Sequence, residues 1–422
     1  MPYKHIVFDI DGTLLDTEYA VLHSLSKTLG TLTGEAPAPE TLRFALGITG
    51  ADTLRRLKLD GRPDAMPLWE QNMNELNSAV RVFDGIEPLL QALRAAGYGL
   101  GIVTSKTRAE FRHDFENISI GQYFTVVVCA DDTAEHKPTA APLLHYAAVA
   151  GADKSELLYI GDSPYDRLCA KNAGTAFALA GWGVPAIPET AAERAAGPCL
   201  DHPRDLYALL YTGQSALPPA PQWLRLGCEL QFIAQAGLTY SKDKFDLERF
   251  ARLREMAAEL LAAHTDCPAE RIDGLFAGEC GFQTPKLDTR AAIFEDGGIL
   301  LVQESNGTWA LPGGWVDADQ SIASNTVKEV REEAGLDVLP RRLIAAQDRK
   351  KHNLPLYAFN ICKVFFLCEK TGGHFTANLE TTDSGYFTPD ALPPLALEKN
   401  TEAQIRMCFA ANAAPCWEAL FD

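Results

Sequence analysis

Several features that would assign a protein to a particular class are missing from this sequence. Its 10 cysteines are scattered and include no Cys-x-x-Cys pair. Several of them, such as Cys129, Cys362 and Cys408, sit inside apolar runs, so we expect reduced, buried thiols in a cytoplasmic protein. No apolar stretch is long enough to span a bilayer, and no basic stretch followed by a long apolar run is visible at the N-terminus. We therefore expect neither a membrane span nor a signal peptide.

Positive charge is also scarce. The chain carries 38 Lys and Arg against 56 Asp and Glu, which gives a formal net charge of −18. This balance disfavours nucleic acids and anionic membrane surfaces as partners, and it means that phosphorylated substrates must be attracted locally, by metal ions and a few basic residues. With 422 residues the chain is too long for one ordinary core, so we expect two or three domains.

Four apolar runs in the first half end where a buried strand would stop. The runs are His5–Phe8, Gly101–Val103, Phe124–Val128 and Leu157–Ile160. The first, second and fourth lead directly into Asp9, Thr104 and Gly161-Asp162, and the third leads to Asp131-Asp132 and then Lys137. In an open parallel sheet, ligands bind outside the carboxyl ends of the strands. The pattern therefore predicts one crevice with paired acids for Mg²⁺ and a Lys and a hydroxyl for a phosphoryl group.

The order and spacing of these polar residues resemble a known superfamily. Asp9-x-Asp11-Gly12-Thr13, Thr104-Ser105, Lys137-Pro138 and Gly161-Asp162-Ser163-x-x-Asp166 look like the four motifs of the haloacid dehalogenase superfamily, nearest to phosphoglycolate phosphatase. One Asp-x-Asp-Gly alone is most often a turn, but four motifs in order are specific. The resemblance covers residues 1–211 and implies an α/β fold with a Rossmann-like parallel sheet.

The resemblance implies a role for each motif residue. Asp9 would be the nucleophile that forms an aspartyl-phosphate, and Asp11 the general acid and base. Thr104 would bind a phosphoryl oxygen, and Lys137 would offset negative charge. Mg²⁺, with Mn²⁺ as an alternative, would be held by Asp9, Asp162 and the backbone carbonyl of Asp11, with Asp166 in an outer role. The further substrate-binding candidates are Gly12, Thr13 and Ser105.

An insert separates the first two motifs. Within residues 16–81, Tyr19, Leu22, Leu25 and Leu29 have helical spacing, and a second helical stretch is predicted from Leu42, Ala45 and Leu46. The insert resembles a helical cap that closes over the site and selects the substrate, on a core of residues 1–15 and 82–211. His23 is near the position of a catalytic His in sugar-phosphate mutases, but it is predicted to be an ordinary cap residue.

The second half begins after a Pro-rich boundary at Thr212–Pro221. Two helices are predicted over residues 222–284, one from Leu224 to Ala234 and one from Phe250 to Leu261, with a linker near Cys280–Pro285. From Thr289 the pattern changes to a hairpin with a Gly turn.

A predicted helix from Ser321 to about Ala334 carries a second acidic cluster. Glu329, Glu332 and Glu333 lie at i, i+3 and i+4, so their side chains share one face. Taken alone, this is a solvated acidic face that Lys328 and Arg331 would partly neutralise.

The flanking residues favour a different interpretation. Trp309-Ala310-Leu311-Pro312-Gly313-Gly314-Trp315 and the closing Gly335-Leu336 resemble the Nudix box, a loop–helix–loop that holds Mg²⁺ against a diphosphate. Glu329, Glu332 and Glu333 would be the metal ligands of a second site, Gly313 and Gly314 would contact the substrate, and residues 286–422 would form an α/β/α sandwich. Gln320 and Lys328 depart from the Glu and Arg of the general box.

Residues 222–284 resemble the helical leader of a Nudix subgroup that includes CDP-choline and ADP-ribose pyrophosphatases. Asp348-Arg349-x-Lys351-His352 and Glu402–Ile405 also look like this subgroup, although a charged surface loop explains the former equally well. The leader suggests a homodimer formed through this half.

Two functions remain open from the sequence. The first is a bifunctional hydrolase that splits a nucleoside diphosphate linked to X and removes phosphate from a monoester. The second is a phosphatase with a Nudix-derived ligand sensor. This alternative is suggested by Gln320 and Lys328, which depart from the general Nudix box. A purely structural protein would need both acidic centres to be idle. The Nudix general base is undecided among Glu380, Asp383 and Glu398.

Overall fold

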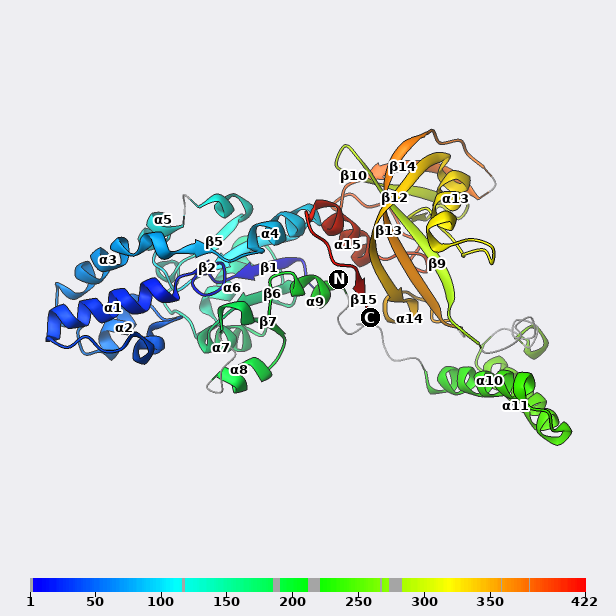
Figure 1. Cartoon of the computed structure of the whole chain (residues 1–422), viewed down its shortest axis with the longest axis horizontal. Coiled ribbons are helices and arrows are strands. Elements are labelled where there is room, and N and C mark those ends of the chain that lie inside the picture. The colour runs from blue at the N-terminus through cyan, green and yellow to red at the C-terminus, as the bar shows by residue number, and fades with distance from the viewer. Residues whose placement is uncertain are drawn as a thin grey trace. The chain divides into compact units, whose positions relative to one another are not determined.

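The computed structural model forms two compact units, Met1–Leu210 with Phe409–Cys416, and Tyr211–Cys408 with Trp417–Asp422 (Figure 1). Each unit is described by itself. The structure describes residues 3–115, 118–184, 190–211, 221–265, 268–272, 283–357, 359–378 and 380–422. Of the predicted boundary at Thr212–Pro221, all but Pro221 lies outside these residues, and so does the first half of the linker near Cys280–Pro285.

A parallel sheet organises the first unit. Its strand order is β5-β4-β1-β6-β7-β8, and every neighbouring pair is parallel. The strands are β1 (His5–Phe8), β4 (Gly99–Val103), β5 (Val126–Val128), β6 (Leu157–Gly161), β7 (Ala176–Ala180) and β8 (Cys199–Leu200). The central strands are apolar throughout because both faces of the sheet are covered, and Ile6, Val7 and Phe8 are all fully buried. The predicted α/β fold with a Rossmann-like parallel sheet is confirmed.

Helices connect the strands of this sheet. They are α4 (Ile86–Ala95), α5 (Arg108–Asp114), α6 (Ala141–Ala150), α7 (Pro164–Ala173), α8 (Ala191–Ala195) and α9 (Asp205–Tyr211), with the 3₁₀ turns η3 (Ser119–Tyr123), η4 (Ala130–Asp132), η5 (Lys154–Glu156) and η6 (Gly181–Gly183). α6 and α7 pack Tyr146 and Cys169 against Val7, Val103 and Tyr159 of the strands. This core fixes the strand ends that carry the predicted site.

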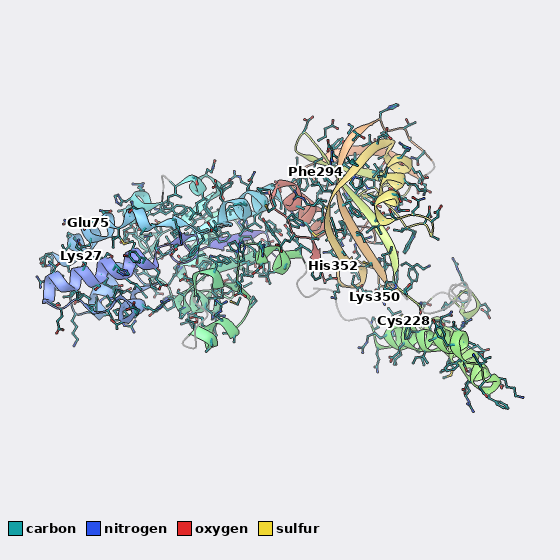
Figure 2. All side chains as sticks on the ribbon, in the orientation of Figure 1. Lys27, Glu75, Cys228, Phe294, Lys350 and His352 are labelled. Atoms are coloured by element: carbon teal, nitrogen blue, oxygen red, sulfur yellow. The ribbon has the colours of Figure 1, made fainter. Side chains whose placement is uncertain are left out.

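The insert forms a small helical cap. A two-stranded ribbon of β2 (Leu15–Asp16) and β3 (Arg81–Val82) joins it to the core. The cap elements are α1 (Glu18–Thr33), η1 (Pro39–Ala45), α2 (Gly50–Arg56), α3 (Ala65–Glu75) and η2 (Asn77–Ala79). Leu22, Leu25 and Leu29 of α1 face the cap core, whereas Tyr19 is largely exposed. Lys27 of α1 and Glu75 of α3 form an ion pair on the cap surface (Figure 2).

The predicted second helical stretch of the cap differs from the structure. Residues 39–45 form a 3₁₀ helix rather than the start of a longer α-helix, and Leu46 is already extended. The helix has therefore ended before Gly47, whose φ of 83° lies in the left-handed region that glycine adopts readily. The resulting loop reaches the core, as described below.

Two helices form the first part of the second unit. α10 (Gln222–Tyr240) and α11 (Lys244–Ala262) confirm the two predicted helices. They approach closely at Gly237, where a Cβ would lie 2.2 Å from the Phe250 ring. Arg254 Nη2 donates to Gln235 Oε1 at 2.9 Å between them. Several large apolar side chains, including Tyr240 and Phe245, are exposed.

A mixed sheet forms the rest of this unit. Its order is β11-β10-β9-β13-β12-β15, with β14 paired to β10. The strands are β9 (Lys286–Glu295), β10 (Gly298–Glu304), β11 (Trp309–Ala310), β12 (Leu336–Asp348), β13 (Ile361–Gly373), β14 (Thr381–Phe387) and β15 (Leu420–Phe421). β9 and β10 form the predicted antiparallel hairpin, so this prediction is confirmed.

Three helices accompany the mixed sheet. They are α13 (Ile322–Ala334), α14 (Arg349–His352) and α15 (Glu402–Ala413), and α13 and α15 lie on opposite faces of the sheet (Figure 1). Ser321 caps α13 by accepting from Ser324 N, and Gly335 ends it with a φ of 67°. Val330 and Ala334 pack on the strands. The predicted extent of this helix is confirmed.

The eight cysteines within the described residues are all free, and Cys129 and Cys408 are buried. Across the same residues, no helix combines the length and hydropathy that a membrane crossing requires.

Candidate active sites

Three predicted carboxylates meet at the ends of β1 and β6. One oxygen from each of Asp9, Asp162 and Asp166 lies within 4.8 Å of the others. Asp9 follows β1 directly, and Asp162 follows the neighbouring parallel strand β6. Asp166 reaches the same place from the first turn of α7, so the sheet and the helix together bring the three side chains into one cluster.

Asp166 is fully buried and its oxygens are already engaged by the protein. Lys137 Nζ lies 2.7 Å from Oδ1, and Tyr159 Oη is 2.8 Å from the same oxygen. Ser163 N and Oγ donate to Oδ2 at 3.1 and 2.6 Å as part of the cap of α7. Asp166 therefore positions Lys137, which also contacts Asp9 Oδ1 at 2.8 Å. This arrangement agrees with an outer role for Asp166.

The charge balance of the cluster favours a cation. Burial is the main cause that raises the pKa of Asp9 to about 7, with Asp166 adding to it and Lys137 opposing it. Burial and the nearby Asp166 likewise raise the pKa of Asp162 well above its usual range. Three carboxylates thus face a single ammonium, and a divalent cation fits this oxygen-rich site.

Asp11 faces a different cation from Asp9. Its Oδ2 lies 3.3 Å from Lys106 Nζ, which also contacts Asp114 Oδ2 at 2.8 Å. Burial would lower the pKa of Lys106, but these two carboxylates raise it above its usual value. The Oδ1 atom of Asp11 is buried without a hydrogen-bond partner among the described residues.

Two loops hold the strand end that carries Asp9. Thr13 Oγ1 donates to Asp162 Oδ1 at 3.3 Å, and Trp182 Nε1 donates to the Thr13 carbonyl at 2.9 Å. A Cβ at Gly183 would lie 1.8 Å from the Gly12 carbonyl oxygen, and a Cβ at Gly12 would lie 2.2 Å from Asp162 Oδ2. Both glycines are needed for this close packing.

The cap loop touches the core at the predicted phosphate-binding residues. Ser105 Oγ donates to the Gly47 carbonyl at 3.1 Å, and a Cβ at Gly47 would lie 2.7 Å from Ser163 Oγ. Thr104 is buried, and its Oγ1 accepts from Lys106 N at 3.2 Å. A cavity of about 950 Å³ lies between cap and core and includes Asp9, Asp11 and Asp162 in its wall.

The predicted Nudix loop packs directly on α13. Gly313 N donates to Glu333 Oε2 at 2.7 Å, and a Cβ at Gly314 would lie 2.6 Å from Glu329 Oε2. Gly313 has a φ of 143°, and a Cβ there would lie 1.9 Å from the Thr289 carbonyl oxygen. Burial raises the pKa of Glu333 to about 7, although Arg290 opposes this shift.

The three glutamates of α13 are arranged more loosely than the aspartates. Lys328 Nζ contacts Glu332 at 2.9 Å, Asp317 at 3.2 Å and Glu329 at 3.3 Å. Within the described residues, the only group of three ligand side chains with oxygens within 4.8 Å of one another is the aspartate cluster. Of the two predicted metal sites, only the aspartate site therefore has its ligand oxygens this close together within the described residues. Arg331 pairs with Asp337 instead of the glutamates.

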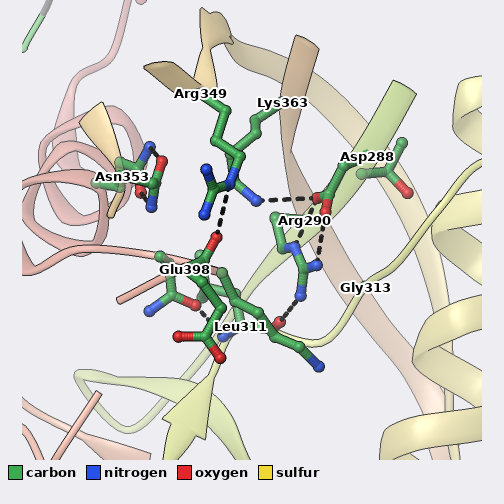
Figure 3. Close-up of polar contacts among 12 residues, drawn as sticks. Asp288, Arg290, Leu311, Gly313, Arg349, Asn353, Lys363 and Glu398 are labelled. Atoms are coloured by element: carbon green, nitrogen blue, oxygen red, sulfur yellow. Dashed lines mark hydrogen bonds and ion pairs between the residues drawn. The ribbon is translucent and has the colours of Figure 1, made fainter. Parts of the chain in front are cut away.

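A buried ion cluster lies behind the Nudix loop (Figure 3). Arg290 donates to both oxygens of Asp288 at 2.7 and 2.8 Å and to the Leu311 carbonyl at 3.1 Å. Lys363 Nζ contacts Asp288 Oδ1 at 3.2 Å. Burial and the charge of Arg290 lower the pKa of Lys363 to about 7. Burial would raise the pKa of Asp288, but the two cations hold it below its usual value.

Arg349 adds a third cation to this cluster (Figure 3). It is buried, lies 3.6 Å above the Tyr357 ring and donates to the Pro355 carbonyl at 2.7 Å. The surface-loop interpretation is therefore wrong for Arg349. Its Nη2 is buried without a partner among the described residues, and burial lowers its pKa. Arg290, Lys363 and Arg349 thus lie in one buried cluster with Asp288, and the carboxylates of Glu333, Glu304 and Glu398 also act on its two arginines.

Other predicted residues of this half have structural partners. Asp348 N and the His352 ring both bond to the Asp422 side chain. Gln404 is buried and bonds to Asn353 and Gln347. Of the candidate bases, Glu380 and Asp383 are exposed. Glu398 is half-buried, and its backbone carbonyl accepts from Arg349 Nε at 3.3 Å.

The fold and the family matches define a hydrolase with two enzyme-family domains. The chain belongs to the haloacid dehalogenase-like hydrolases through residues 6–180 and to the NUDIX family through residues 285–407. Residues 221–276 match a model described as a UDP-X-like, N-terminal oligomerisation domain. The resemblance inferred from the sequence motifs is confirmed.

Individual relatives match each family. YjhB of Bacillus subtilis, a candidate ADP-ribose pyrophosphatase, is 40% identical over 202 residues, which cover 48% of this chain and 97% of its own length. A phosphoglycolate phosphatase of Nitrosospira multiformis is 34% identical over 187 residues, which cover 42% of this chain and 82% of its own. A solved ADP-ribose pyrophosphatase from Streptococcus suis is 54% identical, covering 33% of this chain and 100% of that chain, with a TM-score of 0.31.

The sequence reasoning missed several residues of these sites. Lys106 lies just after Thr104 and Ser105 and gave a weak signal, whereas nothing local pointed to Trp182. Lys363 lies within the apolar run Ile361–Leu367, and a charged residue inside a buried strand was a signal for a buried ion pair. Its partner Asp288 is 75 residues away, so the pair itself was not readable.

Proposed function

We propose that the chain is a bifunctional, divalent-cation-dependent hydrolase. The first half removes phosphate from monoesters through an aspartyl-phosphate, and the second half splits a nucleoside diphosphate linked to X. The observation that carries the proposal is the buried cluster of Asp9, Asp162 and Asp166 around Lys137, in a chain that also has a Nudix loop packed on its glutamate helix.

In the phosphatase half, Asp9 is the proposed nucleophile. Lys137 keeps its carboxylate in place and offsets charge as the carboxylate bonds to phosphorus and the ester oxygen leaves. Asp11, two residues beyond, donates a proton to the leaving alcohol and takes one from the water that hydrolyses the aspartyl-phosphate. Asp9, Asp162 and the Asp11 carbonyl would hold the cation, which would neutralise phosphoryl oxygens.

In the Nudix half, Glu329, Glu332 and Glu333 are the proposed cation ligands. Gly313 N holds Glu333 from the loop side, which fixes one glutamate before any cation arrives. Lys328 occupies the space between the other acids and would have to move when cations bind. When bound there, divalent cations would supply positive charge for the diphosphate and a more acidic water.

The relatives suggest candidate substrates. ADP-ribose is named for relatives of the Nudix half, and phosphoglycolate for a relative of the phosphatase half. The buried Arg349, whose Nη2 has no hydrogen-bond partner among the described residues, supports an anionic substrate in the Nudix half. The exposed apolar side chains of α10 and α11 support a homodimer formed through the leader. The match of residues 221–276 to an oligomerisation domain supports the same assembly.

A Nudix-derived ligand sensor is the second candidate for the latter half. It is favoured by Lys328, because an ammonium bonded to three carboxylates competes with a metal ion for the same oxygens. A sensor would bind the diphosphate without hydrolysing it.

Phosphate release distinguishes the two functions. The full chain with Mg²⁺ is given ADP-ribose and CDP-choline, each with and without an added general phosphatase, and separately a panel of phosphomonoesters. Hydrolysis of a conjugate, with phosphate appearing at least after the added phosphatase, supports the bifunctional enzyme. Binding of the conjugate without any hydrolysis supports the sensor, and failure to hydrolyse every monoester contradicts the phosphatase.

A further inference from the structure

The cavity of the phosphatase half is much larger than a phosphoryl group requires. Its volume is about 950 Å³. It reaches from Asp9 and Asp162 along α1, α3 and η1 of the cap and α5 of the core. Ligand cavities of this order accommodate a whole small metabolite. The space beyond the catalytic residues therefore receives the alcohol part of the substrate, and its wall decides which alcohol is accepted.

That wall is strongly acidic. Away from the catalytic cluster, six carboxylates line it, namely those of Asp16, Glu18, Glu40, Glu70, Glu110 and Asp114. Among the described lining residues, Lys106 is the only Lys or Arg, and its ammonium already contacts Asp11 and Asp114. A carboxylate on the alcohol would thus enter a negative field without a cation to receive it.

The six acids differ in whether other side chains bind them. Arg43 pairs with both oxygens of Glu18 at 2.5 and 3.0 Å, and Glu110 accepts from Thr107 at the start of α5. By contrast, Glu40 and Glu70 make no ion pair with any described residue of the chain, and both are exposed. Their charges act on whatever occupies the cavity.

The cavity also offers aromatic surface. Trp69 is held in place because its Nε1 donates to the buried Ser24 Oγ at 3.0 Å. Tyr19 stacks on His23 with ring centroids 3.9 Å apart, although Tyr19 itself is largely exposed. A cation is attracted by the faces of such rings as well as by carboxylates, whereas an anion is repelled by both.

We propose that this cavity takes phosphomonoesters whose alcohol carries a positive charge, such as an amino alcohol, and discriminates against alcohols that carry a carboxylate. The inference rests on the proposed phosphatase function and names its substrate class. It separates this chain from the phosphoglycolate phosphatase that it resembles, because phosphoglycolate has an anionic alcohol part.

A two-carbon series of phosphomonoesters tests the charge directly. Phosphoethanolamine, 2-hydroxyethyl phosphate and phosphoglycolate have the same length and carry a positive, a neutral and a negative group. The expected kcat/KM falls in this order, by about tenfold at each step. Equal or faster turnover of phosphoglycolate overturns the proposal. Nitrophenyl phosphate is the general substrate: if it is hydrolysed while the series is flat, only this inference fails, and if nothing is hydrolysed, the phosphatase function fails with it.

Charge changes at Glu70 test the wall itself. Because Glu70 is exposed and lacks an ion-pair partner, Glu70→Lys is compatible with folding, which the unfolding midpoint checks. The ratio of kcat/KM for phosphoethanolamine over phosphoglycolate is expected to fall by about tenfold or more. Glu35→Lys is the matched control, because Glu35 is exposed on the cap but does not line the cavity. An unchanged ratio in Glu70→Lys, or an equal change in the control, contradicts the proposal.

Discussion

In the phosphatase half, the acidic side chains lie inside the protein at the ends of adjacent strands, whereas in the Nudix half they project from one helix and differ in exposure, with Glu333 buried, Glu329 half-buried and Glu332 exposed. Asp9 and Asp166 are buried around Lys137. Glu332 is exposed and meets Lys328, which is itself partly exposed. Each centre uses a lysine to bring carboxylates together, but the surroundings of the two lysines differ.

This difference indicates how far the geometry of each centre depends on the ions that it would bind. A buried ammonium between carboxylates cannot be removed without leaving uncompensated charge, so the first centre is rigid and largely formed in advance. An exposed ammonium is weakly held and can be displaced by a divalent cation. The second centre is therefore expected to take its working geometry only when cations are present.

Removing the buried lysine should have the largest effect on stability. Lys137→Met leaves Asp9 and Asp166 without their shared cation, and we expect a loss of about 3–5 kcal/mol in the unfolding free energy of the first unit. Phosphatase activity should fall to background. Chemical denaturation measures the stability, and Lys154→Met on an exposed 3₁₀ turn is the control. A loss no greater than in the control would contradict the account of the first centre.

Of the glycines compared here in the second unit, Gly313 of the Nudix loop should be the less tolerant of a side chain. Gly313→Ala forces a Cβ toward the Thr289 carbonyl oxygen at a positive φ, and we expect a loss of about 2–3 kcal/mol together with loss of Nudix turnover. Gly307→Ala is the control, because Gly307 also has a positive φ but open space around its Cβ. It should lose only about 1 kcal/mol. Equal losses in the two variants would show that the close packing of the loop is unimportant.

The buried Lys363 should give the second unit a pH-dependent stability. Its pKa is lowered to about 7, whereas in the unfolded chain it is about 10.4. Between these values the unfolded chain binds more protons, so the contribution of Lys363 to the unfolding free energy rises from pH 7 to pH 10. Lys363→Met should remove this rise, and Lys370→Met on the same strand should keep it. Unfolding midpoints at several pH values measure it, and parallel curves for wild type and Lys363→Met would refute it.

Removing the exposed lysine should have the smallest effect on stability. Lys328→Met is expected to change the unfolding free energy by less than about 1 kcal/mol, because the ion pairs are exposed to solvent. It should, however, lower the Mg²⁺ concentration needed for half-maximal Nudix activity, since a competitor for Glu332 is gone. A higher Mg²⁺ requirement would indicate that Lys328 supports the site instead.

Much of this architecture was predictable because it follows from local pattern. Apolar runs that end in Asp9 and Asp162 predicted neighbouring parallel strands, and Ser321 and Gly335 predicted both ends of α13. Contacts between distant segments were not predictable. The pairing of Lys363 with Asp288 depends on the register of β9 and β13, and the contact of Gly47 with Ser105 depends on how the cap folds back. Neither leaves a signal in a short stretch of sequence.

The central claim is that one chain carries two independent hydrolytic centres. Asp9→Asn and Glu332→Gln, made separately in the full chain, are assayed with Mg²⁺ for monoester and diphosphate hydrolysis. Asp9→Asn should abolish only monoester hydrolysis, and Glu332→Gln should reduce only diphosphate hydrolysis, each leaving the other rate within about twofold of wild type. Loss of both activities from either single substitution would contradict the claim.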